Sequence, residues 1–162
     1  MIPLGNLWGV WQTLRGGAKT GSVAAATTTL AAMACGQMEN GQPFAPINAV
    51  SHITFGEQAA QQDELSWKYT GTGLLLNHSA NVSWGALYDK LFGRAAAENN
   101  KGMALLGGVL VAVIAYVTDY YLVPKRLTPG FEKRLSNRSL FLVYAALALG
   151  LASGGMMQDE DR

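Results

Sequence analysis

The sequence has few charged side chains and a single cysteine. Of its 162 residues, 14% are charged, against about 25% in a typical soluble domain. Because Cys35 stands alone, an intrachain disulfide framework and a multi-cysteine zinc or iron–sulfur site are excluded. The formal net charge of +1 offers no basic surface to a polyanion, so nucleic acid is not an expected partner.

Motifs of the common catalytic sites are also absent. The sequence has no phosphate-binding loop, no dinucleotide-binding glycine fingerprint, no nucleophile elbow and no zinc-protease motif. It also lacks the paired-histidine and Cys-x-x-Cys-His spacings that indicate a metal site or an attached haem. These absences favour a non-enzymatic protein, although they leave the question of catalysis open.

The sequence instead contains long uncharged stretches. Formal charge is missing from Thr20–Met38, Tyr69–Tyr88, Gly102–Thr118 and Ser139–Gln158. Each stretch is close to the roughly 20 residues that a helix needs to cross a hydrocarbon layer of about 30 Å. A soluble amphipathic helix would carry charged residues along its outer face. The sequence therefore predicts an all-α integral membrane protein, folded as a four-helix transmembrane bundle.

The predicted bundle is one domain over residues 16–157, followed by a polar tail at 158–162. Its four spans are expected at about 17–37, 69–88, 103–123 and 139–157. The last two spans are rich in Leu and Val, whereas the first two contain Thr, Asn, Ser and His. Because polar groups at bilayer depth must find partners, we expect the first two spans on the inside of the bundle.

A short segment, residues 1–15, precedes the first span. Its large apolar side chains recur at helical spacing on one side, at Leu4, Leu7, Trp8, Trp11 and Leu14. Trp favours the headgroup region, so an N-terminal interfacial helix is predicted. The alternative is a cleaved leader, because Arg15 and Lys19 followed by an apolar run up to Cys35 resemble a secretory or lipoprotein signal. The residues before that basic pair favour a retained anchor.

The longest polar stretch, Gln37–Lys68, joins the first two spans. Pro43 and Pro46 interrupt it early, and Thr54–Leu65 is expected to form a short polar helix. A loop of this length in a compact protein is often functional or folded back on the bundle. Since Lys and Arg divide equally between the two predicted sides, charge does not fix the orientation. The acidic character of the long loop favours both termini in the cytoplasm.

A polar and aromatic stripe follows one side of the second span. It covers an arc of about 140° on a helical wheel, and it consists of Gly73, Asn77, His78, Asn81, Trp84, Gly85 and Tyr88. Such a stripe must face protein or water. One interpretation is interhelical hydrogen bonding that holds the bundle together. The other is an intramembrane site of Asn77, His78 and Asn81, with His78 as a metal or haem ligand or a proton relay.

Two residues outside the stripe are further candidates. His52, the other histidine, could share a haem b iron with His78, although a structural role in its loop is the favoured interpretation. Asp119 is the one acid within a predicted span, which makes it a functional hypothesis by default. Ion pairing is its favoured role and proton or ion handling the alternative. The expected ion-pair partners are Lys125, Arg126 or Lys19.

Small residues recur at four-residue spacing in the first and fourth spans. The two series are Gly17-x-x-x-Gly21-x-x-x-Ala25 and Ala146-x-x-x-Gly150-x-x-x-Gly154. Residues without large side chains let helix backbones approach closely. These faces are therefore expected to serve either packing within the chain or docking of a partner.

A combination of motifs is spread over the chain from about residue 16. It comprises Asn48–His52, the group Asn77, His78 and Trp84, and the segment Asp119–Glu132. The combination resembles a family of small, uncharacterised multi-pass membrane proteins of bacteria. That resemblance implies four spans and a bacterial inner membrane. The family has no assigned activity, so the resemblance assigns no catalytic or binding residue.

The favoured function is a non-enzymatic accessory or structural subunit, whose partners are the lipid bilayer and a larger membrane assembly or further copies of itself. A chain of 17.2 kDa with few residues outside its spans leaves little room for a soluble catalytic module. No cofactor is expected for this function. The alternative is a redox protein with haem or metal, or a protein that handles protons or ions, using His78, His52 and Asp119. The sequence identifies neither the partner nor the oligomeric state.

Overall fold

The described chain is built from helices, four of which are long. The structure is a computed structural model that describes residues 4–158, with side chains described from residue 15. The long helices are α1 (Leu4–Asn40), α4 (Tyr69–Ala97), α5 (Lys101–Val117) and α6 (Asn137–Met156). Residues 4–158 contain no strand, so the prediction of an all-α fold is confirmed.

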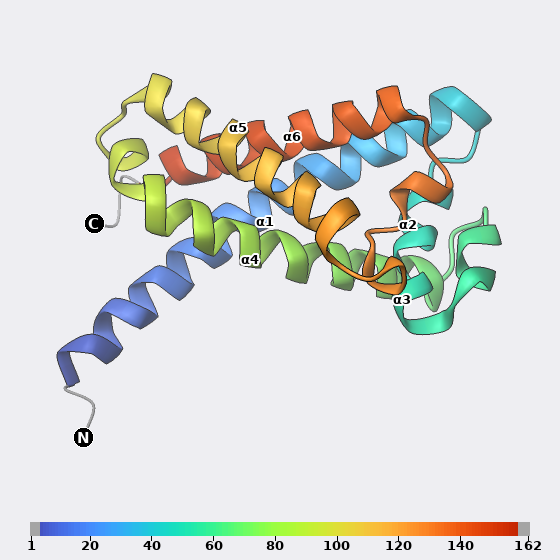
Figure 1. Cartoon of the computed structure of the whole chain (residues 1–162), viewed down its shortest axis with the longest axis horizontal. Coiled ribbons are helices and arrows are strands. Elements are labelled where there is room, and N and C mark those ends of the chain that lie inside the picture. Colours follow the sequence, from blue (N-terminus) through green and yellow to red (C-terminus); the bar gives the residue numbers. More distant parts are fainter. Residues whose placement is uncertain (1–3, 159–162) are drawn as a thin grey trace.

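The four long helices lie side by side as a bundle (Figure 1). Helix α1 packs against α4 and α6, and α5 packs against the same two helices. α1 therefore lies diagonally opposite α5. The N-terminal part of α1 extends past its neighbours at the left of Figure 1.

Short helices and turns close the other end of the bundle, at the right of Figure 1. In chain order they are α2 (Ala45–Val50), α3 (His52–Phe55), η1 (Glu57–Gln61), η3 (Lys125–Leu127) and η4 (Phe131–Lys133). Together with their connections they form a polar cap, defined here as residues 41–68 and 123–136. A single π-helical turn, η2 (Thr118–Leu122), joins α5 to this cap.

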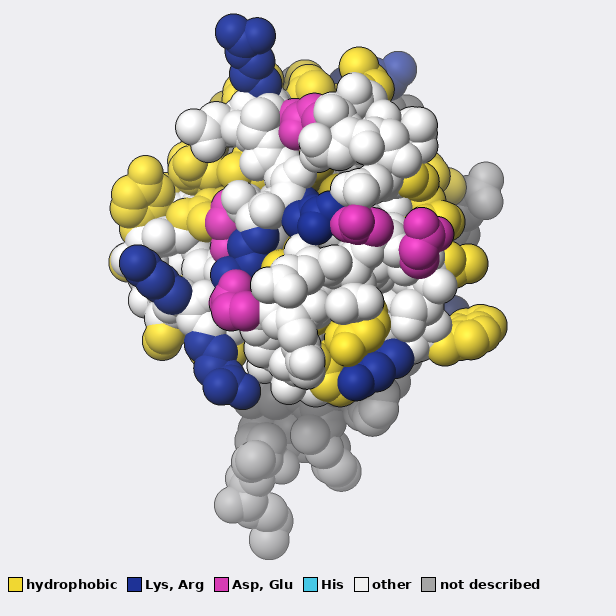
Figure 2. Space-filling view, turned by 90° about the vertical axis from the view of Figure 1, so that its right-hand side faces the viewer, with side chains coloured by type: hydrophobic (Ala, Val, Ile, Leu, Met, Phe, Trp, Pro, Cys, Tyr) yellow, Lys and Arg dark blue, Asp and Glu magenta, His cyan; other side chains and the backbone are white. Residues whose placement is uncertain are grey.

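Ion pairs tie the two segments of the polar cap together. Lys133 Nζ donates to both carboxylate oxygens of Glu57 at 2.9 Å, and the Arg134 guanidinium pairs with Asp63. Figure 2 looks onto this end of the bundle, where charged side chains gather toward the middle and hydrophobic side chains lie mostly around the edge. The cap is thus a polar surface, which contrasts with the flanks of the bundle.

Both predicted series of small residues serve packing within the chain. Gly17 and Gly21 of α1 meet α4 at Gly85, where an added Cβ would lie 2.5 Å from the Gly17 carbonyl oxygen. On α6, a Cβ at Gly150 or Gly154 would lie 2.6 or 2.8 Å from a Cα atom of α1. Backbones in such close approach give α1 tight contacts with both neighbours.

The structure differs from the predicted boundaries in two places. Residues 4–40 form one uninterrupted helix, so residues 4–15 continue into the first predicted span without a break, and their interfacial position stays a prediction. The side chains before residue 15 and residues 159–162 of the predicted tail lie outside the described part. The expected helix Thr54–Leu65 is interrupted by Gly56, whose φ of +77° ends α3 before the turn η1 begins.

Two of the four predicted spans meet the length and hydropathy expected of a membrane crossing. They are Lys101–Leu122 and Asn137–Met156. Helices α1 and α4 are longer, but they do not qualify because of their Thr, Ser, Asn and charged residues. The four-helix arrangement is therefore observed, whereas a crossing by all four helices stays a prediction.

Candidate functional site

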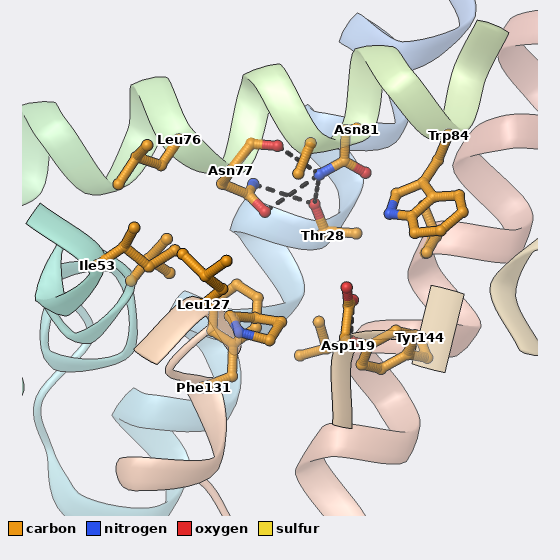
Figure 3. A pocket seen from close by; sticks show the side chains of 15 residues that line it. Thr28, Ile53, Leu76, Asn77, Asn81, Trp84, Asp119, Leu127, Phe131 and Tyr144 are labelled. Atoms are coloured by element: carbon orange, nitrogen blue, oxygen red, sulfur yellow. Dashed lines mark hydrogen bonds between the residues drawn. The ribbon is translucent and has the colours of Figure 1, made fainter. Parts of the chain in front are cut away.

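A pocket lies between α4, α1, α6 and the segments that follow α2 and α5 (Figure 3). Its volume of about 250 Å³ is slightly below the roughly 300–1,000 Å³ of sites for drug-sized ligands. Most of the wall is aliphatic or aromatic, and Trp84 and Phe131 contribute rings. The polar side chains in the wall are Thr28, Asn77, Asn81, Asp119 and Tyr144.

The two asparagines of α4 hold this helix against α1. Asn77 Nδ2 donates to the Thr28 and Thr29 hydroxyls at 3.3 and 3.1 Å. Asn81 Nδ2 donates to the Asn77 carbonyl oxygen at 2.8 Å and to the Thr28 hydroxyl at 3.4 Å. Interhelical hydrogen bonding, the first interpretation of the stripe, is therefore confirmed for these residues. The four-residue spacing explains it, because it places both amides on one side of α4.

One oxygen of this network has no partner. Asn81 is 4% exposed, and its Oδ1 atom accepts no hydrogen bond from any described residue. A buried acceptor left in this state costs about 1–3 kcal/mol. Asn81 is itself one of the residues that line the pocket.

Asp119 enters the pocket from η2 and is bound by a residue of α6. The Tyr144 hydroxyl donates to Asp119 Oδ2 at 2.6 Å, and no basic side chain among the described residues lies within ion-pair distance of Asp119. The predicted ion pair with Lys125, Arg126 or Lys19 is therefore wrong. Its physical reason is the path of the chain, because Pro124 follows η2 and leaves Lys125 and Arg126 exposed.

Tyr144 was missed in the sequence, although a signal for it exists. It carries the only phenol in the otherwise apolar span at 139–157, and a buried tyrosine hydroxyl usually finds a hydrogen-bond partner. Its ring also packs at right angles against Tyr116, with centroids 5.2 Å apart. Tyr144 therefore fixes the Asp119 carboxylate in position at the pocket wall.

The two histidines do not join this site. His52 is 2% exposed, and its Nε2 donates to the Thr128 carbonyl oxygen at 2.9 Å. This bond supports the structural role expected for His52, because it ties α3 to the turn before η4. His78 is exposed on α4 and is not part of the pocket wall. That His52 and His78 share a haem b iron stays a prediction. His52 is buried in the cap, whereas His78 is exposed on α4.

No cluster of three or more His, Cys, Asp or Glu side chains suited to a metal ion occurs in the described part of the chain. The pocket wall itself contains one formally charged side chain, Asp119, and no lysine, arginine, histidine or cysteine among the described residues. The polar groups of the wall are thus one carboxylate, two amides and two hydroxyls. Its acceptor atoms and rings are suited to binding rather than to covalent chemistry.

The chain matches no protein-family model, no curated protein and no solved structure. The resemblance to small multi-pass bacterial membrane proteins therefore stays a prediction.

Two carboxylates of the cap region are stabilised in their charged form. Hydrogen bonds from the hydroxyls of Ser136 and Ser139, at the start of α6, lower the pKa of Glu39 at the end of α1. The hydrogen bond from Lys133 lowers the pKa of Glu57. Both act outside the pocket: Glu39 joins α1 to the start of α6, and Glu57 joins the two segments of the cap.

Proposed function

We propose that this chain is a non-enzymatic accessory subunit embedded in a membrane, where α1 and α4 pack against a transmembrane helix of another membrane protein. The first support is the outer face of α5. Its apolar side chains are each between 41 and 55% exposed: Leu105, Leu106, Val109, Leu110, Val113, Ile114 and Val117.

Water is a poor environment for this face of α5. Each half-exposed Leu, Val or Ile leaves roughly 1 kcal/mol of transfer free energy unrealised. Seven such side chains on one helix add up to several kcal/mol, which is comparable with the 5–15 kcal/mol stability of a whole domain. A contiguous apolar face of this kind is typical of a lipid or protein contact. The 22 residues of Lys101–Leu122 extend over about 30 Å, the thickness of the hydrocarbon layer.

The outer sides of α1 and α4 have a different character. The exposed positions in the middle of these helices include Ser22 and Ala26 on α1, and His78, Ser79 and Ser83 on α4. Exposed leucines lie among them at Leu30, Leu74 and Leu75. The hydroxyls of Ser22 and Ser79 donate to carbonyl oxygens of their own helices at 2.7 and 2.8 Å. The imidazole of His78 has no hydrogen-bond partner among the described residues.

The depth of His78 in the bundle makes that imidazole the observation that carries the proposal. Its neighbour Asn77 is bonded to Thr28, and the adjacent Thr27 hydroxyl donates to the Ala146 carbonyl oxygen in the middle of α6 at 2.9 Å. If α6 crosses the bilayer, His78 lies well inside it. A polar side chain at that depth faces protein or a water-filled cavity rather than lipid.

Site-specific photo-crosslinking in native membranes tests this proposal. A benzophenone amino acid replaces Ser79 on the outer side of α4, and in a matched variant it replaces Val113 on the outer side of α5. We expect a discrete protein adduct from position 79 and none from position 113, because the second position faces lipid. The replacement His78→Leu should lower the yield of the co-purified partner in mild detergent while the melting temperature of the chain itself stays unchanged.

Three outcomes would contradict the proposal. Crosslinking from position 79 to lipid alone would show that no protein docks on this side of α4. An adduct at twice the mass of 17.2 kDa would identify a second copy of this chain in place of another protein. Recovery of the chain in the supernatant without detergent would show that it is not embedded in a membrane. The bacterial inner membrane and cytoplasmic termini remain parts of the proposal that rest on the resemblance and on the acidic loop.

A further inference from the structure

We infer that the pocket between α4 and η2 is a binding site for a compact organic cation, such as a quaternary ammonium or a protonated alkylamine. The inference does not depend on the proposed docking of α1 and α4, because the pocket lies on another side of α4. It rests on three features of the wall: its charge, its acceptor atoms and its rings.

The charge of the wall selects a cation. Asp119 is the one formally charged side chain in the wall, and no described basic side chain is paired with it. Its Oδ2 is held by the Tyr144 hydroxyl, which leaves Oδ1 without a hydrogen bond from a described residue. A positive group in the pocket would meet an opposite charge in surroundings of low dielectric constant, where the attraction exceeds that in water.

A second polar atom in the wall that has no described partner is also an acceptor. Asn81 is more than nine-tenths buried, and its unpartnered Oδ1 belongs to the same wall as Asp119 (Figure 3). A cation would be attracted to both oxygens, whereas an anion would face two acceptors and no basic side chain. The wall therefore disfavours phosphates and carboxylates.

The rings and aliphatic side chains of the wall determine which further groups of the ligand can bind. Trp84, Phe131 and Tyr144 offer aromatic surface in the wall, and such rings attract ammonium groups by about 0.5–2 kcal/mol each. Leu76, Ile53 and their neighbours would contact alkyl substituents. A cavity of about 250 Å³ limits the ligand to a small molecule.

The mouth of the pocket is marked by the wall residues that are exposed. Ala80 on α4 and Leu127 in η3 both line the pocket and are exposed. The entrance therefore lies between the outer turn of α4 and the edge of the polar cap. A ligand would enter from the boundary between the cap and the flank of the bundle.

Calorimetric titration of the purified full-length chain in a non-ionic detergent tests the inference. The probes are choline and its neutral isostere, in which a tert-butyl group replaces the trimethylammonium group. We expect choline to bind at least about tenfold more tightly than the isostere. In D119N this preference should fall to about twofold or less, and E98Q at the other end of the bundle should keep it. Phosphocholine should bind more weakly than choline, because the wall lacks a basic side chain for the phosphate.

A second variant guards against misfolding of D119N. In A80W the new side chain starts at an exposed position, so the fold is expected to persist while the mouth is blocked and binding of both probes is lost. Equal affinity for choline and the isostere, an unchanged preference in D119N, or phosphocholine binding as tightly as choline would each overturn the inference. Absence of any choline binding at millimolar concentration would overturn it as well.

Discussion

The close contact between α1 and α4 makes a quantitative prediction about Gly85. An added Cβ at this position would lie 2.5 Å from the Gly17 carbonyl oxygen and from the Gly21 nitrogen. Ordinary contact begins at 3.4 Å, so G85A requires the two helices to separate by almost one ångström. The atoms it meets are backbone, which cannot move aside without displacing α1.

The expected cost combines three effects. Overpacking of this kind destabilises by about 1–3 kcal/mol. Separation also stretches the bonds from Asn77 and Asn81 to Thr28, which are already 3.3 and 3.4 Å long, and each such bond contributes about 1 kcal/mol or less in a membrane bundle. Against this, replacing a helical glycine by alanine gains about 0.5–1 kcal/mol. We expect a net loss of about 1–3 kcal/mol for G85A.

Gly71 provides the matched control on the same helix. The nearest atom to a Cβ at this position is Trp67 Cε3 at 3.9 Å, so G71A gains the helical preference without a clash and should be slightly more stable than the parent. The assay is unfolding in mixed micelles with increasing dodecyl sulfate, followed by circular dichroism. Equal unfolding midpoints for G85A and G71A would refute the reasoning that backbone contact holds α1 and α4 together.

Two further predictions concern individual hydrogen-bonded side chains. In Y88F the Ala104 carbonyl oxygen loses the buried hydroxyl that donates to it at 3.0 Å, so the free energy of unfolding should fall by about 1 kcal/mol; an unchanged midpoint would show that α4 and α5 do not depend on this bond. Because Ser136 and Ser139 lower the pKa of Glu39, the stability it contributes is present above its ordinary value of 4.5 and is lost as the pH falls further. Solvent exposure keeps this contribution below about 1 kcal/mol. In E39Q, which cannot titrate at this position, this part of the fall in melting temperature at low pH should be absent.

Local sequence patterns predicted the helices and part of their contacts. The spacing of Gly17 and Gly21 indicated a close helix contact, since four-residue spacing repeats one side of a helix. The same rule placed Asn77 and Asn81 together. The sequence did not show whether the glycine contact lies within the chain or between two chains, because small residues pack closely in the same way in both cases.

The errors arose where the answer depends on the other helices. His78 follows Asn77 directly and lies about 100° further around α4. The predicted polar stripe spans about 140°, so the sequence did not show which residues of the stripe face α1. The partner of Asp119 was sought among nearby basic residues, but it is Tyr144 on α6. The pocket was not predictable at all, because its wall combines α1, α4, α6 and the polar cap.

The order of the helices along the chain bears on how such a protein would be made. The two segments apolar enough to enter lipid unaided, Lys101–Leu122 and Asn137–Met156, leave the ribosome after α1 and α4. In the proposed membrane setting, α1 and α4 emerge earlier and carry Asn, Thr and Ser groups that lipid disfavours. Stable insertion of the first half must then wait for the C-terminal hairpin. Nascent chains halted near residue 100 should consequently be extracted by alkaline carbonate, whereas full-length chains should resist it.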